Sequence, residues 1–224
     1  MLSIRNIFQK KALVLMYHKI AEPPTDPWEL AVSEKNFEAH LQVLKRKYNV
    51  ISIDELTESL NNKKLGNKVI AITFDDGYLN NFTIAKPLLE QYKIPASFFI
   101  TDSNLVNQQP FWWDELEQVI IHSEKLPQKF ELKFGSDNLA FDLAGESELN
   151  NFIKSKHERF IAYEPPTLRA TLYFKLWQLM SSLLKRDQDA LMNRIREWSE
   201  VDKNGVTIEI CMSLKQLKEL AENK

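Results

Sequence analysis

The chain has 224 residues, with 29 Lys and Arg against 31 Asp and Glu, so its formal net charge is −2. Apolar and aromatic residues make up 44%, enough to bury a core, while only five Gly and nine Pro exclude collagen-like and low-complexity chains. The single cysteine excludes an internal disulfide. The near-neutral net charge differs from the positive charge that is typical of proteins that bind nucleic acids.

The amino-terminal sequence lacks the features of a membrane anchor or an export signal. Its apolar run over residues 12–17 is shorter than the roughly 20 residues that span a bilayer. No small-residue cleavage pattern follows the run. We therefore expect a chain that is cytoplasmic as given, with no membrane span and no nucleic-acid partner.

Strands and helices alternate from the start of the chain. Ala12–Tyr17 is predicted to be a buried strand, and residues 21–32, with three prolines, a loop. Ser33 is predicted to cap a helix whose apolar residues are spaced by four and three: Phe37, Leu41 and Leu44. A short strand over Tyr48–Ser52 then leads into a second helix, which the capping box Ser52-Ile-Asp-Glu55 begins.

The strongest predicted strand is Lys68–Phe74, which is apolar at nearly every position, as in a strand covered on both faces. Residues 80–92 are predicted to form a helix, and Ala96–Thr101 another buried strand. A strand, a helix and a strand in this order predict a parallel sheet or barrel with a right-handed crossover.

The alternation stops after residue 102. Phe111-Trp112-Trp113 begins a predicted helix that runs to about residue 124, and Lys129–Phe134 is predicted to pair with Leu139–Asp142 as a hairpin. Residues 146–200 are predicted to be helical, with an interruption at Pro165-Pro166.

Strand character returns over Val206–Ile210, and the capping box Ser213-Leu-Lys-Gln216 begins a last helix. We therefore divide the chain into residues 1–102, a mainly helical insertion over 103–205, and a returning strand and helix over 206–224.

Two adjacent carboxylates end the strongest strand, in Thr73-Phe74-Asp75-Asp76-Gly77. Asp-Gly after a strand is also a common turn signal, so a plain turn is one interpretation. However, groups at the carboxyl end of a parallel strand line the site of α/β proteins, and two adjacent acids repel unless a cation or a proton separates them. One carboxylate can then bind a metal while the other takes a proton from water.

This motif, Thr73–Gly77, resembles the first motif of the polysaccharide deacetylases, carbohydrate esterase family four. Leu15-Met16-Tyr17-His18 resembles the first strand of the branch that acts on poly-N-acetylglucosamine. Ile94–Phe99 and Met212–Leu217 resemble further segments in the family's order, so the resemblance covers about residues 12–112 and 206–222.

The resemblance implies an α/β fold, a partial and distorted (β/α) barrel of the glycoside hydrolase/deacetylase type with a mainly helical insertion. It implies hydrolysis of an acetyl group, N-linked or O-linked, on a polysaccharide, with the glycan as the substrate. Asp75 would be the catalytic base and Asp76 a ligand of a divalent metal, commonly zinc. Tyr17 and His18 are candidates to line the site, with structural hydrogen bonding as the alternative for His18.

The family completes its metal site with a His-x-x-x-His motif, and none of the four histidines has that spacing: His18, His40, His122 and His157. Because a catalytic zinc takes three protein ligands, we expect an incomplete site. We then expect the chain to be the amino-terminal part of a deacetylase, completed by a missing carboxyl-terminal half or a complementing chain. A non-catalytic carbohydrate-binding or degenerate barrel module, and an unstable fragment, are the alternatives.

The remaining polar and aromatic candidates are predicted to be structural. His40 is expected to be partly buried on its helix, and His122 and His157 to lie on the surface of the insertion. Trp112 and Trp113 could stack on sugar rings, but packing against the inserted helices is favoured. Cys211 is expected to be a small buried apolar group.

Overall fold

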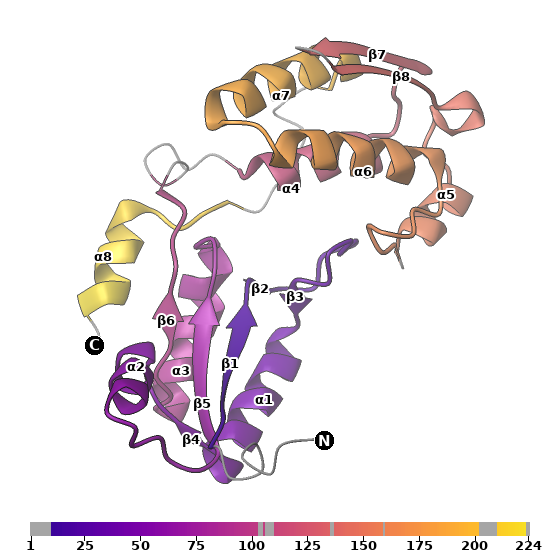
Figure 1. Ribbon diagram of the computed structural model, residues 1–224. Helices are drawn as coiled ribbons and strands as arrows, with labels where there is room; N and C mark the ends of the chain where they lie inside the picture. The colour runs from indigo at the N-terminus through magenta and orange to yellow at the C-terminus, as the bar shows by residue number, and fades with distance from the viewer. Residues whose placement is uncertain are drawn as a thin grey trace, which may run out of the picture. The chain divides into compact units, whose positions relative to one another are not determined.

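The computed structural model describes residues 10–102, 105, 110–134, 137–158, 160–201 and 210–222. The chain forms two compact units (Figure 1). The first unit contains Met1–Glu22, Leu30–Gln109 and Ile210–Lys224, and the second contains Pro23–Glu29 and Pro110–Glu209. The expected divisions at residues 102 and 205 stay a prediction. Within the described residues, no helix has the length and apolar character needed to cross a membrane.

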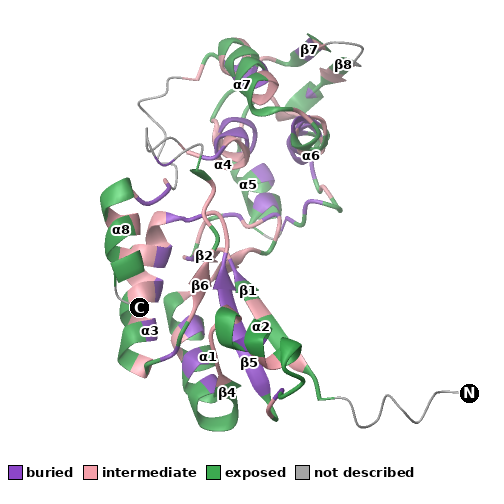
Figure 2. Ribbon diagram, turned by 60° about the vertical axis from the view of Figure 1, so that its left-hand side comes forward, coloured by how far each residue is buried: buried purple, intermediate pink, exposed green. Residues whose placement is uncertain are grey.

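The first unit is built on a parallel sheet. Its strands β1 (Ala12–Tyr17), β5 (Val69–Phe74) and β4 (Asn49–Val50) lie in the order β1-β5-β4, and β6 (Ser97–Phe98) also pairs with β5. All six residues of β5 are buried, as predicted, and Figure 2 shows the strand in purple along its length. The predicted parallel sheet is therefore confirmed, with shorter strands than expected at β4 and β6. The expected burial of Ala96–Thr101 is wrong, because β6 is half-buried and Phe99 is 55% exposed.

Strand β1 is correctly predicted, but its expected burial is wrong. Leu13, Val14 and Met16 are 58%, 51% and 61% exposed. β1 lies at the end of the described strand order and pairs with β5 along one side. An apolar run indicates that a strand has apolar side chains. It does not indicate which other helices or strands cover those side chains.

Helices α1 (Glu34–Lys47) and α2 (Ile53–Asn61) begin where their caps predict. The Ser33 side chain accepts a hydrogen bond from the backbone N–H of Asn36, and Ser52 and Glu55 form the complete capping box. The buried residues of α1 are the three predicted from their spacing: Phe37, Leu41 and Leu44. These side chains share one core cluster with Ile70, Ile72 and Phe74 of β5.

The predicted helix over residues 80–92 is a π-helical turn, Asn81–Ala85, followed by α3 (Lys86–Tyr92). The last helix, α8 (Leu214–Glu222), follows the predicted capping box, because Ser213 N–H donates to Gln216 and Gln216 N–H donates to the Ser213 hydroxyl oxygen. A short second sheet pairs β2 (Lys19–Ile20) with β3 (Ala31–Val32). Residues 206–209 of the predicted strand Val206–Ile210 lie outside the described residues.

The second unit is mainly helical. Its helices are α4 (Trp112–Glu117), α5 (Asn151–His157), α6 (Leu168–Ser181) and α7 (Lys185–Ser199), with a π-helical turn at Gln118–His122 and a 3₁₀ turn at Ala144–Glu146. The predicted hairpin is confirmed as antiparallel β7 (Lys129–Phe134) and β8 (Asp137–Asp142). These elements share a core cluster that includes Leu116, Ile120, Phe130, Leu172, Leu176 and Leu191.

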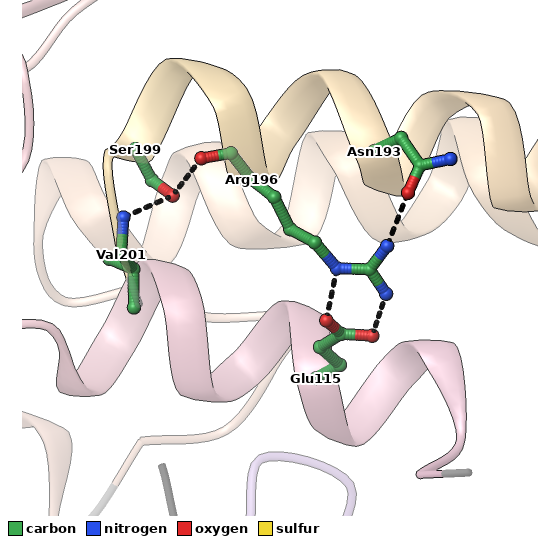
Figure 3. Close-up of polar contacts among 5 residues, drawn as sticks. All are labelled: Glu115, Asn193, Arg196, Ser199 and Val201. Carbon is green, nitrogen blue, oxygen red and sulfur yellow. Dashed lines mark hydrogen bonds and ion pairs between the residues drawn. The ribbon is translucent and has the colours of Figure 1, made fainter. Parts of the chain in front are cut away.

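An ion pair joins α4 to α7 inside the second unit. Arg196 donates from Nε and Nη2 to the two carboxylate oxygens of Glu115, as Figure 3 shows. Its third donor, Nη1, reaches Oδ1 of Asn193 at 2.5 Å. A two-point contact of this kind fixes the orientation of both side chains as well as their distance.

A second arginine, Arg169, is completely buried in the same unit. Its guanidinium donates to the backbone carbonyls of Glu146, Ser123 and Ser147 at 2.6, 2.5 and 2.6 Å. Burial lowers the pKa of Arg169 to about 10, with Glu146 opposing that shift. Arg169 therefore remains charged at neutral pH and donates to the carbonyls of Glu146 and Ser123, and to that of Ser147, which also accepts a hydrogen bond from the Leu126 N–H.

The described residues thus combine helices with a parallel sheet, as predicted for an α/β fold. No closed barrel is formed within the parts of the chain that the structure describes. A partial (β/α) barrel stays a proposal, which we take up with the function.

Candidate functional site

The two predicted acids lie in a sharp turn at the carboxyl end of β5. The backbone N–H of Asp75 donates to the carbonyl of Tyr17 at 2.9 Å, which extends the β1–β5 pairing by one residue. Gly77 N–H then donates to the Asp75 carbonyl at 2.9 Å. Asp76 and Gly77 follow with φ values of 69° and 88°, both in the left-handed region. Local strain of this kind at a non-glycine residue is concentrated at functional sites.

Gly77 cannot be replaced by a larger residue without strain. A Cβ atom at this position would lie 3.0 Å from Cδ1 and 3.2 Å from Cγ2 of Ile100. Its positive φ is also costly for any residue with a Cβ. The glycine of the acidic motif therefore has a steric reason to be there.

The turn is fixed by backbone hydrogen bonds from two other segments. Thr101 N–H donates to the Asp76 carbonyl at 3.2 Å. On the other side, Leu79 N–H donates to Ile210 and Met212 N–H donates to Gly77, both at 2.9 Å. The acid pair is therefore held by the chain after β6 and by the chain before α8, which lie far apart in the sequence.

Asp76 is half-buried, and the charged groups around it shift the pKa of its carboxyl in opposite directions. Burial raises the pKa of the Asp76 carboxyl, and the neighbouring Asp75 raises it further. His18, Lys19 and a hydrogen bond from the Thr101 side chain act in the opposite direction. A cation placed beside Asp75 and Asp76 would offset both the desolvation and the repulsion, so the pair favours a cationic ligand.

The two candidate lining residues are placed differently. The Tyr17 side chain packs in the core, with its ring stacked on Phe74 at 5.5 Å between centroids and its hydroxyl 3.2 Å from Nδ1 of His40. Burial raises the pKa of the Tyr17 hydroxyl. His18 is half-buried and close enough to Asp76 to act on its pKa, while its backbone carbonyl accepts a hydrogen bond from Asn81 at 2.8 Å.

Lys19 and Thr101 also contribute to the site and were not predicted. Lys19 acts on Asp76 electrostatically, and its Nζ lies 4.7 Å from the ring centroid of Tyr78. Thr101 contacts Asp76 through both its backbone and its side chain. Lys19 directly follows the Leu15–His18 segment, which was a usable signal, but no spacing rule points to Thr101.

The described residues do not assemble a three-ligand metal site. No group of three or more His, Cys, Asp or Glu side chains suited to a metal occurs among them. A catalytic zinc takes three protein ligands, whereas this turn offers two carboxylates with the His18 imidazole nearby. The donor set found here therefore does not fit a catalytic zinc unless further ligands are supplied.

A groove of about 820 Å³ lies elsewhere in the first unit, along α3, β6 and α8. Its walls are largely apolar, with Leu89, Phe98, Leu217 and Leu220 among the lining residues. Asp75 and Asp76 are not part of this lining. The acid pair is thus a half-buried surface feature separate from the groove.

The predicted surface position of the two inserted histidines is wrong. His157 is 3% exposed, with Nε2 2.8 Å from the Thr167 hydroxyl, and burial lowers its pKa to about 4. His122 is half-buried and lies 2.9 Å from the Thr25 hydroxyl. The insertion forms a hydrophobic core of its own. Polar side chains are buried beside this core because they form hydrogen bonds there.

The predictions that His40 is partly buried and that Cys211 is buried differ in outcome. His40 is exposed on α1 rather than partly buried, although its ring contacts Tyr17. Cys211 is completely buried, as predicted, and burial raises the pKa of its thiol.

The part of the chain that contains the acidic motif is similar to known polysaccharide deacetylases. Residues 62–122 match the family model described as polysaccharide deacetylase. YxkH of Bacillus subtilis (strain 168), named as a polysaccharide deacetylase, is 31% identical over 114 residues, which are 50% of this chain and 39% of that protein. The chain thus spans about two fifths of the length of this curated relative.

Solved structures of deacetylases also resemble part of the chain. The Streptococcus pyogenes deacetylase PplD in complex with acetate is 29% identical, with a TM-score of 0.38, over 42% of this chain and 44% of that one. IcaB from Ammonifex degensii is 24% identical, with a TM-score of 0.41, over 49% of this chain and 48% of that one. The family model and the curated relative show that the chain resembles the polysaccharide deacetylase family.

Proposed function

We propose that this chain carries the acidic part of a metal-dependent polysaccharide deacetylase that removes acetyl groups from N-acetylated sugars. The observation that carries the proposal is the strained Asp75–Asp76 turn at the end of the buried central strand. This turn lies inside the range that matches the deacetylase family model. The order of the strands around it supports, as part of the proposal, a partial (β/α) barrel.

Asp75 is the proposed general base. In amide hydrolysis, the oxygen of a water molecule attacks the acetyl carbonyl carbon and its proton passes to a base. The carbon–nitrogen bond then breaks, acetate is released, and the sugar nitrogen leaves as an amine after taking up a proton. Asp75 is half-buried rather than enclosed, so part of the residue is accessible to water and to a substrate.

Asp76 is the proposed ligand of a divalent metal, with zinc as the first candidate. Its carboxylate is half-buried next to a second acid, where a cation is favoured. Since the described residues do not provide three ligands, the proposal requires ligands from outside them, in the same protein or from a complementing chain.

A non-catalytic carbohydrate-binding module is the second candidate function. The observation that favours it is the lack of a three-ligand group among the described residues, together with the lack of His-x-x-x-His in the sequence. Such a module would bind a glycan without any need for a metal.

Acetate release separates the two candidates. Chitin oligomers or acetylated poly-glucosamine are incubated with the protein and a divalent metal, with and without a chelator. Release of acetate that the chelator stops supports the deacetylase. Glycan binding that the chelator does not affect, with no acetate released, supports the binding module.

A further inference from the structure

The second unit contains a continuous set of aromatic side chains, here called the aromatic cluster: Trp28, Trp112, Tyr163, Phe174 and Trp177. The ring centroids of Trp28 and Trp177 lie 4.1 Å apart. Trp28 also contacts Tyr163 at 5.5 Å and Phe174 at 6.1 Å, and Trp112 lies 6.1 Å from Trp177. Trp28 is therefore the centre of the aromatic cluster.

The aromatic cluster lies at the margin of the core of the second unit, against which Trp112 and Trp177 pack. Tyr163 is 73% exposed, and the other four side chains are half-buried. Exposed apolar patches with polar groups at their edge mark sites of interaction. Indole and phenol rings offer flat apolar faces, which match the C–H faces of sugar rings. Because these side chains have few rotatable bonds, they lose little conformational entropy on binding.

The loop that carries Trp28 is fixed to the second unit at several points. The indole Nε1 of Trp28 donates to the Tyr173 hydroxyl at 2.8 Å, and the backbone N–H of Ala162 donates to the Pro27 carbonyl at 2.8 Å. The Thr25 hydroxyl donates to Glu117 and lies 2.9 Å from Nε2 of His122. The central ring is thus held in place before any ligand arrives, which reduces the entropy lost on binding.

Three carboxylates act on the Tyr173 hydroxyl, which is the hydrogen-bond acceptor for Trp28. Asp26, Asp114 and Glu117 are all half-buried and act electrostatically on the Tyr173 hydroxyl that holds Trp28. Across the second unit as a whole, Asp and Glu outnumber Lys and Arg. Aromatic faces together with nearby carboxylates favour a cationic ligand, because both the ring quadrupole and the negative charges attract it.

We propose that the aromatic cluster binds a glycan with free amino groups, that is, a glucosamine-containing oligosaccharide in its ammonium form. The sugar ring stacks on the ring of the exposed Tyr163, which stands at 89° to the ring of Trp28, and its ammonium group lies near Asp114. The choice of a glycan rests on the proposed function, since removal of acetyl groups from an N-acetylated sugar produces this chemistry. The second unit then retains the product strand, or recognises partly deacetylated substrate.

Binding of chitosan oligosaccharides to the whole chain tests the proposal, measured by calorimetry and tryptophan fluorescence. We expect Tyr163→Ala to weaken binding about fivefold, which is the loss of one exposed ring contact. Phe152→Ala is the matched control, because Phe152 is a 67% exposed aromatic residue of the same unit outside the aromatic cluster. Fully acetylated chitin oligomers should bind more weakly than chitosan, and Asp114→Asn should reduce that preference.

Several results would overturn the proposal. These are a lack of chitosan binding by the folded chain, equal losses from Tyr163→Ala and Phe152→Ala, or binding of a lysine-rich peptide in preference to chitosan. The test is repeated with Asp189→Asn, at an exposed carboxylate of the same unit, which should bind chitosan as the unaltered chain does. Chitosan binding without any acetate release would overturn the proposed function and leave this inference standing.

Discussion

Met212 donates its backbone N–H to the carbonyl of Gly77 at 2.9 Å, so the segment before α8 is bound directly to the acidic turn. Residues 78 and 211 also form an antiparallel bridge. The larger part of the second unit, Pro110–Glu209, lies in the sequence between these two contacting segments. The chain that returns from the insertion therefore helps to fix the backbone of Asp75 and Asp76.

The first prediction concerns the strained glycine. Gly77→Ala should reduce the free energy of unfolding by about 1–2 kcal/mol, because the added Cβ meets Ile100 in a left-handed conformation. Urea unfolding followed by circular dichroism measures the change. Gly145→Ala is the control, since a Cβ there meets no atom within 4 Å. Equal effects of the two substitutions would show that the turn is not strained.

The second prediction concerns the buried arginine of the second unit. Arg169→Met should destabilise the protein by about 3 kcal/mol, because the carbonyls of Glu146 and Ser123 lose the guanidinium as a hydrogen-bond donor. Arg186→Met, at a side chain 91% exposed, should change stability by less than about 0.5 kcal/mol. A similarly small effect at Arg169 would contradict the hydrogen-bond network described for it.

The third prediction concerns pH. The folded pKa of His157 is about 4, below its ordinary value of 6.5, so folding favours the neutral imidazole. Its contribution to stability is complete above pH 6.5 and is lost as the pH falls towards 4, by an amount on the order of 2 kcal/mol. In His157→Gln, this part of the pH dependence should disappear. An unchanged dependence between pH 7 and pH 4 would show that His157 does not titrate as described.

The fourth prediction concerns zinc. Calorimetry on these 224 residues should show weak binding only, since the described residues lack a three-ligand group. Asp76→Ala should then change that weak binding little. Sub-micromolar zinc binding that Asp76→Ala abolishes would instead show that a complete site is present.

Local sequence signals predicted much of the first unit. Ser33 and Ser52 mark the starts of α1 and α2, and the all-apolar run of β5 identifies the central strand. The helix caps depend on residues within four positions in the sequence, and the central strand is identified by the burial of all its residues. The exposure of Leu13 and Met16 in β1 was not predictable in the same way, because it depends on what lies beside the strand.

Long-range polar contacts account for most of what the sequence did not reveal. Arg169 binds carbonyls about 22 to 49 residues away, and Thr25 meets His122 across 97 residues. No spacing rule links such positions. At the candidate site, the acid pair was apparent from the Asp75-Asp76-Gly77 motif, whereas the contacts of Lys19 and Thr101 with Asp76 required the folded structure.

The most direct test of the central claim is acetate release from acetylated glucosamine oligomers at saturating divalent metal, measured with and without Asp75→Asn on the complete protein, in which the metal ligands from outside the described residues are present. We predict that the unaltered protein releases acetate and that Asp75→Asn reduces the rate about a hundredfold or more, as expected when a general base is removed. The exposed Asp189→Asn should retain the full rate. Acetate release that is unchanged in Asp75→Asn, or no release by the folded protein at any metal concentration, would contradict the account.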